Sequence, residues 1–144
     1  SRFGTAEDHR QKMEELSGNP VWHTIAEVEP IGPKKLLDIL VIAPCTGNTL
    51  GKLACGIYDT SVTLSAKSHL RNNRPLVIAV STNDGLAASA KNIGALQNYK
   101  NVFFVPYRQD DPIKKPTSLV ADMDRITDTV AAALEGRQIQ PVLL

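Results

Sequence analysis

Asp38-Ile39-Leu40-Val41-Ile42-Ala43 carries no polar residue after its first position. A strand with one face in solvent alternates polar and apolar residues, so this unbroken run predicts a strand buried on both faces, as in a parallel sheet. Pro44 ends the run. Two further runs of the same kind, at 76–80 and 102–105, predict two more buried strands.

The segments around these strands have the spacing and end signals of helices. In the last of them Leu119, Met123, Ile126, Val130 and Leu134 recur at intervals of four, three, four and four residues, which predicts one helix over 118–134. The other expected elements are helices over 6–17, 61–72 and 92–98, a loop that runs into a helix over 46–56, a short strand over 21–25 and a loop over 29–37. Alternating strands and helices predict an α/β fold, a three-layer Rossmann- or flavodoxin-like parallel sheet with helices on both faces.

The composition is that of one globular domain spanning residues 1–144, with 42% hydrophobic residues and a formal net charge of +1. The absence of a basic excess disfavours a nucleic-acid partner. No apolar run reaches the length of about 18 residues that a membrane span requires. Two cysteines form no disulfide framework, which favours a reducing compartment and hence the cytoplasm.

In open sheets of this class, ligands bind at the carboxyl ends of the strands. The loops that follow the three runs are 44–48, 81–85 and 106–112. The first continues into Thr46, Gly47, Asn48 and Thr49, whose hydroxyls, amide and backbone N–H groups suit an anion or a polar ring edge. In the alternative interpretation, Thr46 or Asn48 simply caps the helix.

Other chemistry-bearing residues are weaker candidates. Cys45 faces the expected ligand end, whereas Cys55 is expected to pack in the core, and the two match no zinc spacing. The three histidines, His9, His23 and His69, form no metal-binding pair, so no metal is expected. Ser81, Thr82, Asn83 and Asp84 form either a turn with a helix cap or a set of ligand contacts.

Residues 43–54, Ala43-Pro44-Cys45-Thr46-Gly47-Asn48-Thr49-Leu50-Gly51-Lys52-Leu53-Ala54, resemble a motif of the flavoprotein family, which includes FMN-dependent cysteine decarboxylases and prenyl-FMN synthases. Residues 56–63 match the continuation of that motif, with Thr60 in place of an asparagine. The resemblance implies FMN as cofactor. It implies contacts from Pro44, Cys45, Thr46, Gly47, Asn48 and Thr49, with Ser81, Thr82 and Asn83 on the substrate side.

Further segments, at 70–75, 80–84, 100–106, 109–112, 114–121 and 138–142, are similar to one branch of this family, the B subunits of dipicolinate synthase. This similarity implies an oxidoreductase subunit that acts during sporulation with an A subunit, which carries NADP, to form pyridine-2,6-dicarboxylate from a dihydrodipicolinate-type precursor. Family trimers and dodecamers imply a homo-oligomer. On charge alone, Arg71, Arg74 or Arg108 would suit a dicarboxylate.

The chain departs from the decarboxylase pattern at three places. Pro30 stands where the decarboxylases carry their catalytic histidine, only Asn83 remains of their substrate motif, and their late cysteine has no counterpart. We therefore assign no catalytic residue. Two alternatives remain, a non-catalytic scaffold subunit with a degenerate flavin pocket, and an FMN-dependent decarboxylase or prenyltransferase of the same family.

The resemblance also implies that the family's first βα unit and most of its second strand lie before Ser1. A chain without them would expose an apolar strand edge, which is prone to aggregate. We therefore expect either upstream residues or a partner chain to cover that edge.

Overall fold

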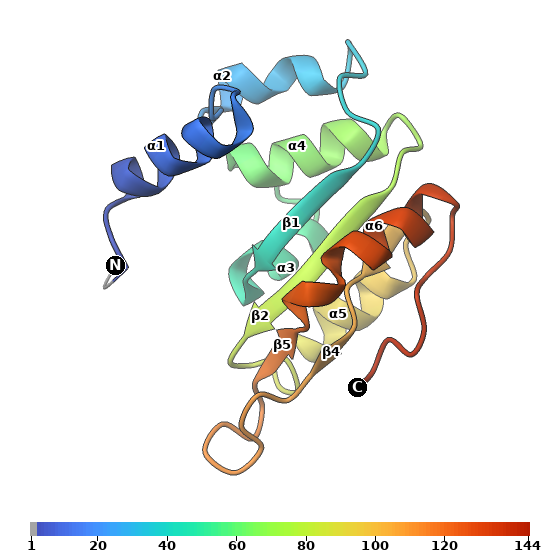
Figure 1. Cartoon of the computed structure of the whole chain (residues 1–144). Coiled ribbons are helices and arrows are strands. Elements are labelled where there is room, and N and C mark those ends of the chain that lie inside the picture. Colours follow the sequence, from blue (N-terminus) through green and yellow to red (C-terminus); the bar gives the residue numbers. More distant parts are fainter. Residues whose placement is uncertain (1–2) are drawn as a thin grey trace.

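The computed structural model describes residues 3–144 and has a central sheet flanked by helices (Figure 1). The strands are β1 (Leu40–Cys45), β2 (Leu76–Thr82), β3 (Val102–Phe104), β4 (Tyr107–Arg108) and β5 (Leu119–Ala121). Their order is β1-β2-β5-β4, with β3 beside the first half of β2. The α/β class is confirmed, and β1, β2 and β3 are parallel as predicted. The sheet as a whole is mixed, because β5 runs antiparallel to both β2 and β4.

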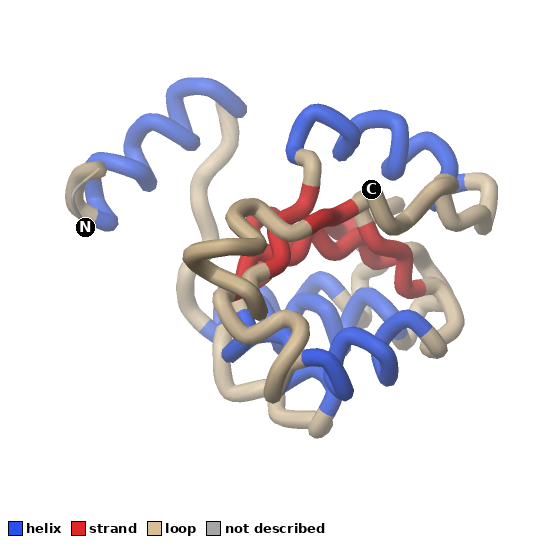
Figure 2. Tube along the Cα trace, turned by 90° about the horizontal axis from the view of Figure 1, so that it is seen from below, coloured by secondary structure: helices blue, strands red, loops and turns tan. Residues whose placement is uncertain are grey.

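Helices cover both faces of this sheet. Figures 1 and 2 show α6 (Ile126–Leu134) on one face and α3 (Gly47–Ala54), α4 (Ser61–Leu70) and α5 (Ala90–Gln97) on the other. These helices match the predicted ones to within a few residues at each end, apart from the start of α6. The three-layer arrangement is therefore confirmed. No helix within residues 3–144 is both long and apolar enough to cross a membrane.

β2 lies at the centre of the hydrophobic core. Its first five residues, Leu76 to Val80, are almost completely buried, because β1 and β3 pair with its two edges and helices pack against both of its faces. The prediction of strands buried on both faces is thereby confirmed for β2 and for β3, where Phe104 is fully buried. β1 has β2 as its one paired neighbour among residues 3–144. Leu40 and Val41 are only partly buried and Ala43 is exposed, so the prediction of burial on both faces is wrong for this strand.

The predicted helix over 118–134 is wrong in its first half. Leu119–Ala121 form β5, and a 3-10 turn (Met123–Arg125) separates this strand from α6. The backbone of β5 pairs with the last residues of β2 and with β4, and this pairing outweighs the local helical pattern. Met123 and Leu134 are 39% and 55% exposed, so the periodic residues do not form one buried face.

The N-terminal region contains one confirmed helix and one wrong strand. α1 (Ala6–Ser17), the helix predicted over 6–17, begins at a capping box between Thr5 and Asp8, but it buries none of its residues and extends away from the sheet (Figure 1). The predicted strand over 21–25 is absent. Instead Thr24 caps the short helix α2 (Ile25–Val28), and a 3-10 turn (Glu29–Ile31) follows in the predicted loop.

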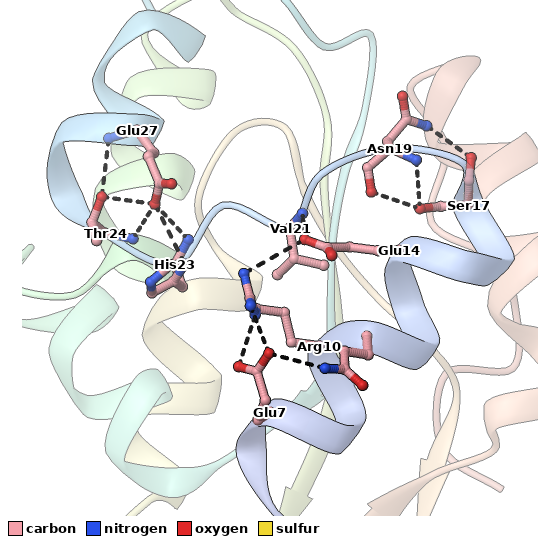
Figure 3. Close-up of polar contacts among 10 residues, drawn as sticks. Glu7, Arg10, Glu14, Ser17, Asn19, Val21, His23, Thr24 and Glu27 are labelled. Carbon is pink, nitrogen blue, oxygen red and sulfur yellow. Dashed lines mark hydrogen bonds and ion pairs between the residues drawn. The ribbon is translucent and has the colours of Figure 1, made fainter.

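Side-chain hydrogen bonds fix the backbone of the connection between α1 and α2 (Figure 3). The Glu14 carboxylate accepts a hydrogen bond from the backbone N–H of Val21 at 3.0 Å, which ties α1 to the connection that follows it. Glu27 accepts from the backbone N–H groups of His23 and Thr24 at 3.0 and 2.8 Å. The connection between α1 and α2 is therefore fixed by polar contacts rather than by burial.

The C-terminal tail docks on the same chain. The Gln138 side chain accepts from the backbone N–H of Phe104 and donates to its carbonyl, both at 2.7 Å, in the manner of a neighbouring strand. Tyr107 then exchanges backbone hydrogen bonds with Val142 and Leu144. These contacts cover the outer edge of β3 and of β4. The apolar tail therefore does not remain free.

Folding stability should decrease as the pH falls through about 6.5, because of His69. His69 is fully buried on α4, its Nε2 donates to the Pro75 carbonyl at 2.8 Å, and its Nδ1 has no hydrogen-bond partner among residues 3–144. Burial lowers the pKa of His69 below its usual value. The unfolded chain therefore takes up this proton first, and each pH unit below about 6.5 costs at most about 1.4 kcal/mol until the folded state also titrates.

Urea unfolding of the wild type and of His69→Gln at pH 7.5 and 5.5 measures this effect. Glutamine retains a donor for Pro75 but does not titrate, so the variant should lose less stability on acidification. The two proteins differ only at position 69, so any other pH-dependent contribution cancels in the comparison. Equal losses in the two proteins would show that His69 does not cause the pH dependence.

Candidate functional site

The carboxyl ends of β1 and β2 bring the first two predicted ligand loops together. Gly47, the first residue of α3, lies against the loop after β2. A Cβ atom added to Gly47 would lie 2.7 Å from Thr82 Oγ1, 2.9 Å from Asp84 Oδ1 and 3.0 Å from Ser89 Oγ. The two loops therefore touch at a position that has room only for glycine.

The first loop presents polar groups at the start of α3. Thr46 Oγ1 accepts from the Thr49 backbone N–H at 3.5 Å, so the capping interpretation is confirmed. Capping does not use all the polar groups, because the N–H groups of Gly47 and Asn48 have no partner inside the helix. The Thr46 and Asn48 side chains are exposed. This end of α3 can therefore donate hydrogen bonds to a ligand while it stays capped.

Of the two predicted cofactor contacts Cys45 and Pro44, Cys45 is buried and Pro44 is exposed. Cys45 is fully buried in the core, and this burial raises the pKa of its thiol to about 12, so it is a neutral thiol at physiological pH. Its side chain faces the core rather than the loop surface. Pro44 is exposed and lines an apolar hollow of about 270 Å³ beside β1, together with Trp22 and Val62. Cys55, expected in the core, is exposed.

The loop after β2 is organised by Asp84. Thr82 Oγ1 and Ser89 Oγ both donate to Asp84 Oδ1, at 2.5 and 2.9 Å, and these hydrogen bonds lower the pKa of Asp84. The hydroxyl proton of Thr82 is thus already used, which leaves its oxygen as an acceptor. The sequence pattern places Asp84 in a turn or a set of ligand contacts without identifying it as the acceptor that organises the loop, and it assigns no role to Ser89. The sequence signal for this hydrogen bond is the spacing of the two residues, because Asp84 follows two positions after Thr82, the last residue of β2.

Ser81 and Asn83 are the other two predicted substrate contacts. Ser81 is half-buried and pairs with Val120 of β5, whereas Asn83 is exposed and its carbonyl accepts from Thr117 Oγ1 at 2.7 Å. The Asn83 side chain makes no hydrogen bond within residues 3–144, so its amide is open to a ligand. Of the three predicted substrate contacts, Thr82 lies against Gly47 of the first loop, and Asn83 has the most accessible side chain.

The three arginines suggested for a dicarboxylate separate in space. Arg71 follows α4 and Arg74 precedes β2, where Arg74 donates to the carbonyls of Lys35 and Leu37. Both lie toward the amino end of β2, so they do not serve a ligand at its carboxyl end. Arg108 is exposed on β4, opposite Val120, which in turn lies opposite Ser81. Two strand spacings put Arg108 about 10 Å from Ser81.

Replacing Asp84 should destabilise the loop that carries the predicted substrate contacts. Asp84→Ala leaves the Thr82 hydroxyl and the buried Ser89 hydroxyl without their acceptor, which should cost about 1–3 kcal/mol of unfolding free energy. Asp84→Asn keeps an oxygen acceptor and should cost less. Because hydrogen bonds lower the pKa of Asp84, its carboxylate stabilises the fold above about pH 3.8, and this contribution is lost as the pH falls further.

Urea unfolding between pH 7 and pH 2.5 tests both parts of this prediction. The difference between wild type and Asp84→Asn should shrink toward the acid end, where the carboxyl is protonated. A difference that stays constant with pH would argue against a stabilising charge at Asp84. Asp128, an exposed acid on α6 without a side-chain partner in residues 3–144, provides the matched control as Asp128→Asn.

Comparison with known proteins identifies relatives along the whole chain. The family model described as "Flavoprotein" matches residues 2–135. The B subunit of dipicolinate synthase from Bacillus subtilis is 46% identical over 144 residues, which are the entire chain and 72% of that protein. A crystal structure of the dipicolinate synthase B subunit from Bacillus halodurans C superposes with a TM-score of 0.94 at 42% identity, over 100% of this chain and 74% of the other.

A more distant structure has the same fold. The FMN-dependent cysteine decarboxylase SpaF matches with a TM-score of 0.62 at 22% identity, over 88% of this chain and 71% of the other. Together with the match of the family model and the identity over the full chain, this likeness agrees with the motif at residues 43–54. The chain belongs to the flavoprotein family, in the branch that contains the B subunits of dipicolinate synthase.

Proposed function

We propose that this chain acts as the B subunit of a dipicolinate synthase in the cytoplasm of sporulating cells. In this role it works with an NADP-dependent A subunit to form pyridine-2,6-dicarboxylate from a dihydrodipicolinate-type precursor. The observation that carries the proposal is the 46% identity over the whole chain to a B subunit of that enzyme, which includes both loops of the candidate site. The net reaction removes two hydrogens from the precursor. NADP⁺ accepts a hydride, and a proton is released.

The residues at the carboxyl ends of β1 and β2 fit partial contact with a flavin. Thr46 and Asn48 present an exposed hydroxyl and amide, and Gly47 and Asn48 add backbone N–H groups that suit a phosphate or the polar edge of a ring. The hollow beside Pro44 adds an apolar surface next to these polar groups. A bound flavin would supply reversible electron acceptance. Such a flavin would be held mainly by neutral donors.

The side chains in these two loops include no good general acid or base. The two titratable groups in the adjoining loops are Cys45, whose pKa burial raises to about 12, and Asp84, whose carboxylate accepts from Thr82 and Ser89. Neither is a base poised to act near neutral pH. This observation favours a second candidate function, a scaffold subunit that orients the A subunit without performing chemistry itself. Homo-oligomerisation, as in the wider family, accompanies both candidates.

Reconstitution of the full-length protein with its A subunit tests the proposed function. We expect dipicolinate to form with NADP⁺ only when both subunits are present, and flavin absorbance to accompany the purified B subunit or to be gained on adding FMN. Asn48→Ala should weaken FMN binding about 3- to 10-fold through loss of the amide. Asn98→Ala, an exposed asparagine after α5, should bind FMN like the wild type.

The outcomes separate the alternatives. A protein that binds no FMN but still restores activity to the A subunit is the scaffold. A protein that leaves the A subunit inactive under all conditions is not a synthase subunit. Release of CO₂ from a peptidyl or pantothenoyl cysteine would instead indicate a decarboxylase.

A further inference from the structure

A second hollow lies at the opposite end of the sheet from the candidate site. It encloses about 310 Å³ near the amino end of β2, where the last turns of α3, α4 and α5 approach one another. Leu53, Leu76 and Leu96, all buried, form its apolar floor. Leu76 and Ser81 are five residues apart on β2, so this hollow is about 16 Å from the candidate site along the strand.

Two tyrosines and a lysine line the rim of the hollow. Tyr58 is partly buried and Tyr99 is 44% exposed, and both belong to its lining. The Lys67 ammonium lies 4.9 Å from the centre of the Tyr58 ring, within the range of a cation–π interaction. The rim thus combines aromatic surface with a positive charge.

The charges on this rim are not neutralised. Lys67 and Arg71 are one helical turn apart on the α4 segment, and neither makes an ion pair within residues 3–144. The acid nearest to Tyr58 in sequence, Asp59, is already paired with Lys52 at 2.7 Å. The lining of the hollow contains no carboxylate.

A neighbouring hollow extends the positive surface. It encloses about 440 Å³, shares Lys67 and Arg71 with the first, and is lined in addition by Lys34 and Glu29. The ridge between the two hollows therefore carries two cations, Lys67 and Arg71, and the far hollow adds one cation and one carboxylate. A net positive ridge beside an apolar floor and two aromatic rings attracts a ligand that is both planar and anionic.

We propose that the hollow between Tyr58, Lys67, Arg71 and Tyr99 binds a small aromatic carboxylate, with its ring on the leucine floor and its carboxylates at Lys67 and Arg71. The volume of about 310 Å³ lies at the lower end of ligand sites and suits a ligand with one ring. Arginine pairs with a carboxylate through two parallel hydrogen bonds, and lysine adds a point charge. This site is additional to the proposed synthase role and does not depend on it.

Calorimetric titration of the full-length protein with benzene-1,3-dicarboxylate, without A subunit or added FMN, tests the site. We expect saturable binding with a dissociation constant of about 1 mM or tighter. Arg71→Gln and Lys67→Gln should each weaken binding about tenfold. Cyclohexane-1,3-dicarboxylate has the same charges without an aromatic ring and should bind more weakly than the aromatic acid.

Two control variants locate the binding. Lys91→Gln removes the same charge from the start of α5, away from the hollow, and should leave the affinity unchanged. Asn48→Ala, in the candidate flavin site, should also leave it unchanged. The proposal is overturned by an absence of saturable binding up to about 10 mM. It is overturned equally by binding that survives Arg71→Gln and Lys67→Gln together but is lost in Asn48→Ala.

Discussion

A Gly47→Ala variant should lose about 1–3 kcal/mol of unfolding free energy and most of its affinity for FMN. The added methyl group would lie 2.7 and 2.9 Å from the oxygens of Thr82 and Asp84, closer than nonbonded atoms approach a Cβ, and 3.0 Å from Ser89 Oγ, which is a tight contact. These oxygens are joined by hydrogen bonds, so they cannot move apart independently. Relief of the clash would shift α3 away from the loop after β2 and separate the two halves of the candidate site.

Gly51→Ala provides the matched control in the same helix. A Cβ at Gly51 meets its nearest neighbour, Asn92 Nδ2, at an ordinary 3.5 Å. This variant should therefore be as stable as the wild type or gain up to about 1 kcal/mol from the helix propensity of alanine. Urea unfolding and FMN titration of both variants measure the contrast. If Gly47→Ala matched Gly51→Ala in both, the close contact between the loops would not matter for stability or binding.

Phe104→Ala should have the largest effect on stability, a loss of about 3–5 kcal/mol of unfolding free energy. Phe104 is fully buried on β3, opposite Ile78 of β2, and its ring centre lies 6.2 Å from that of Tyr107. Both backbone hydrogen bonds of Phe104 with Gln138 remain possible in the variant, so the loss reports side-chain packing. Stabilities of whole domains are about 5–15 kcal/mol, so this single change removes a large part of the total.

Thermal and urea unfolding of Phe104→Ala and Phe104→Leu check this prediction. Leucine fills more of the space and should retain most of the stability, because a smaller cavity costs less. Ile113, which is 90% exposed, serves as the control position, since Ile113→Ala should change stability by less than about 0.5 kcal/mol. A Phe104→Ala protein as stable as Ile113→Ala would mean that the core does not close around the Phe104 ring.

Local patterns in the sequence are sufficient for part of the fold. The unbroken apolar runs identify the positions of β1, β2 and β3, and for β2 and β3 the reason is burial on both faces, which excludes polar residues. The Thr5 and Asp8 capping box marks the start of α1. The motif at residues 43–54 leads to the flavoprotein family, whose model matches residues 2–135. Each of these signals lies within a few residues along the chain.

The candidate site illustrates what such signals leave undetermined. The sequence places Thr46 and Asn83 in loops at the same edge of the sheet, and the approach of Gly47 to Thr82 agrees with that expectation. It does not indicate that Thr82 donates its proton to Asp84, because that hydrogen bond depends on the turn of the loop toward Ser89. It also does not distinguish Arg108 from Arg71, which lie toward opposite ends of β2.

The sequence by itself determined the α/β class, the positions of the three parallel strands and the two loops that adjoin each other, since these follow from periodicity and from chain order. Only the tertiary structure decided that Leu119–Ala121 is a strand, that the Cys45 thiol faces the core, and that the Gln138 side chain completes the edge of β3. The physical reason is the range of the interactions. Burial and backbone pairing depend on partners far away in the sequence, and when these partners are available they outweigh local preference.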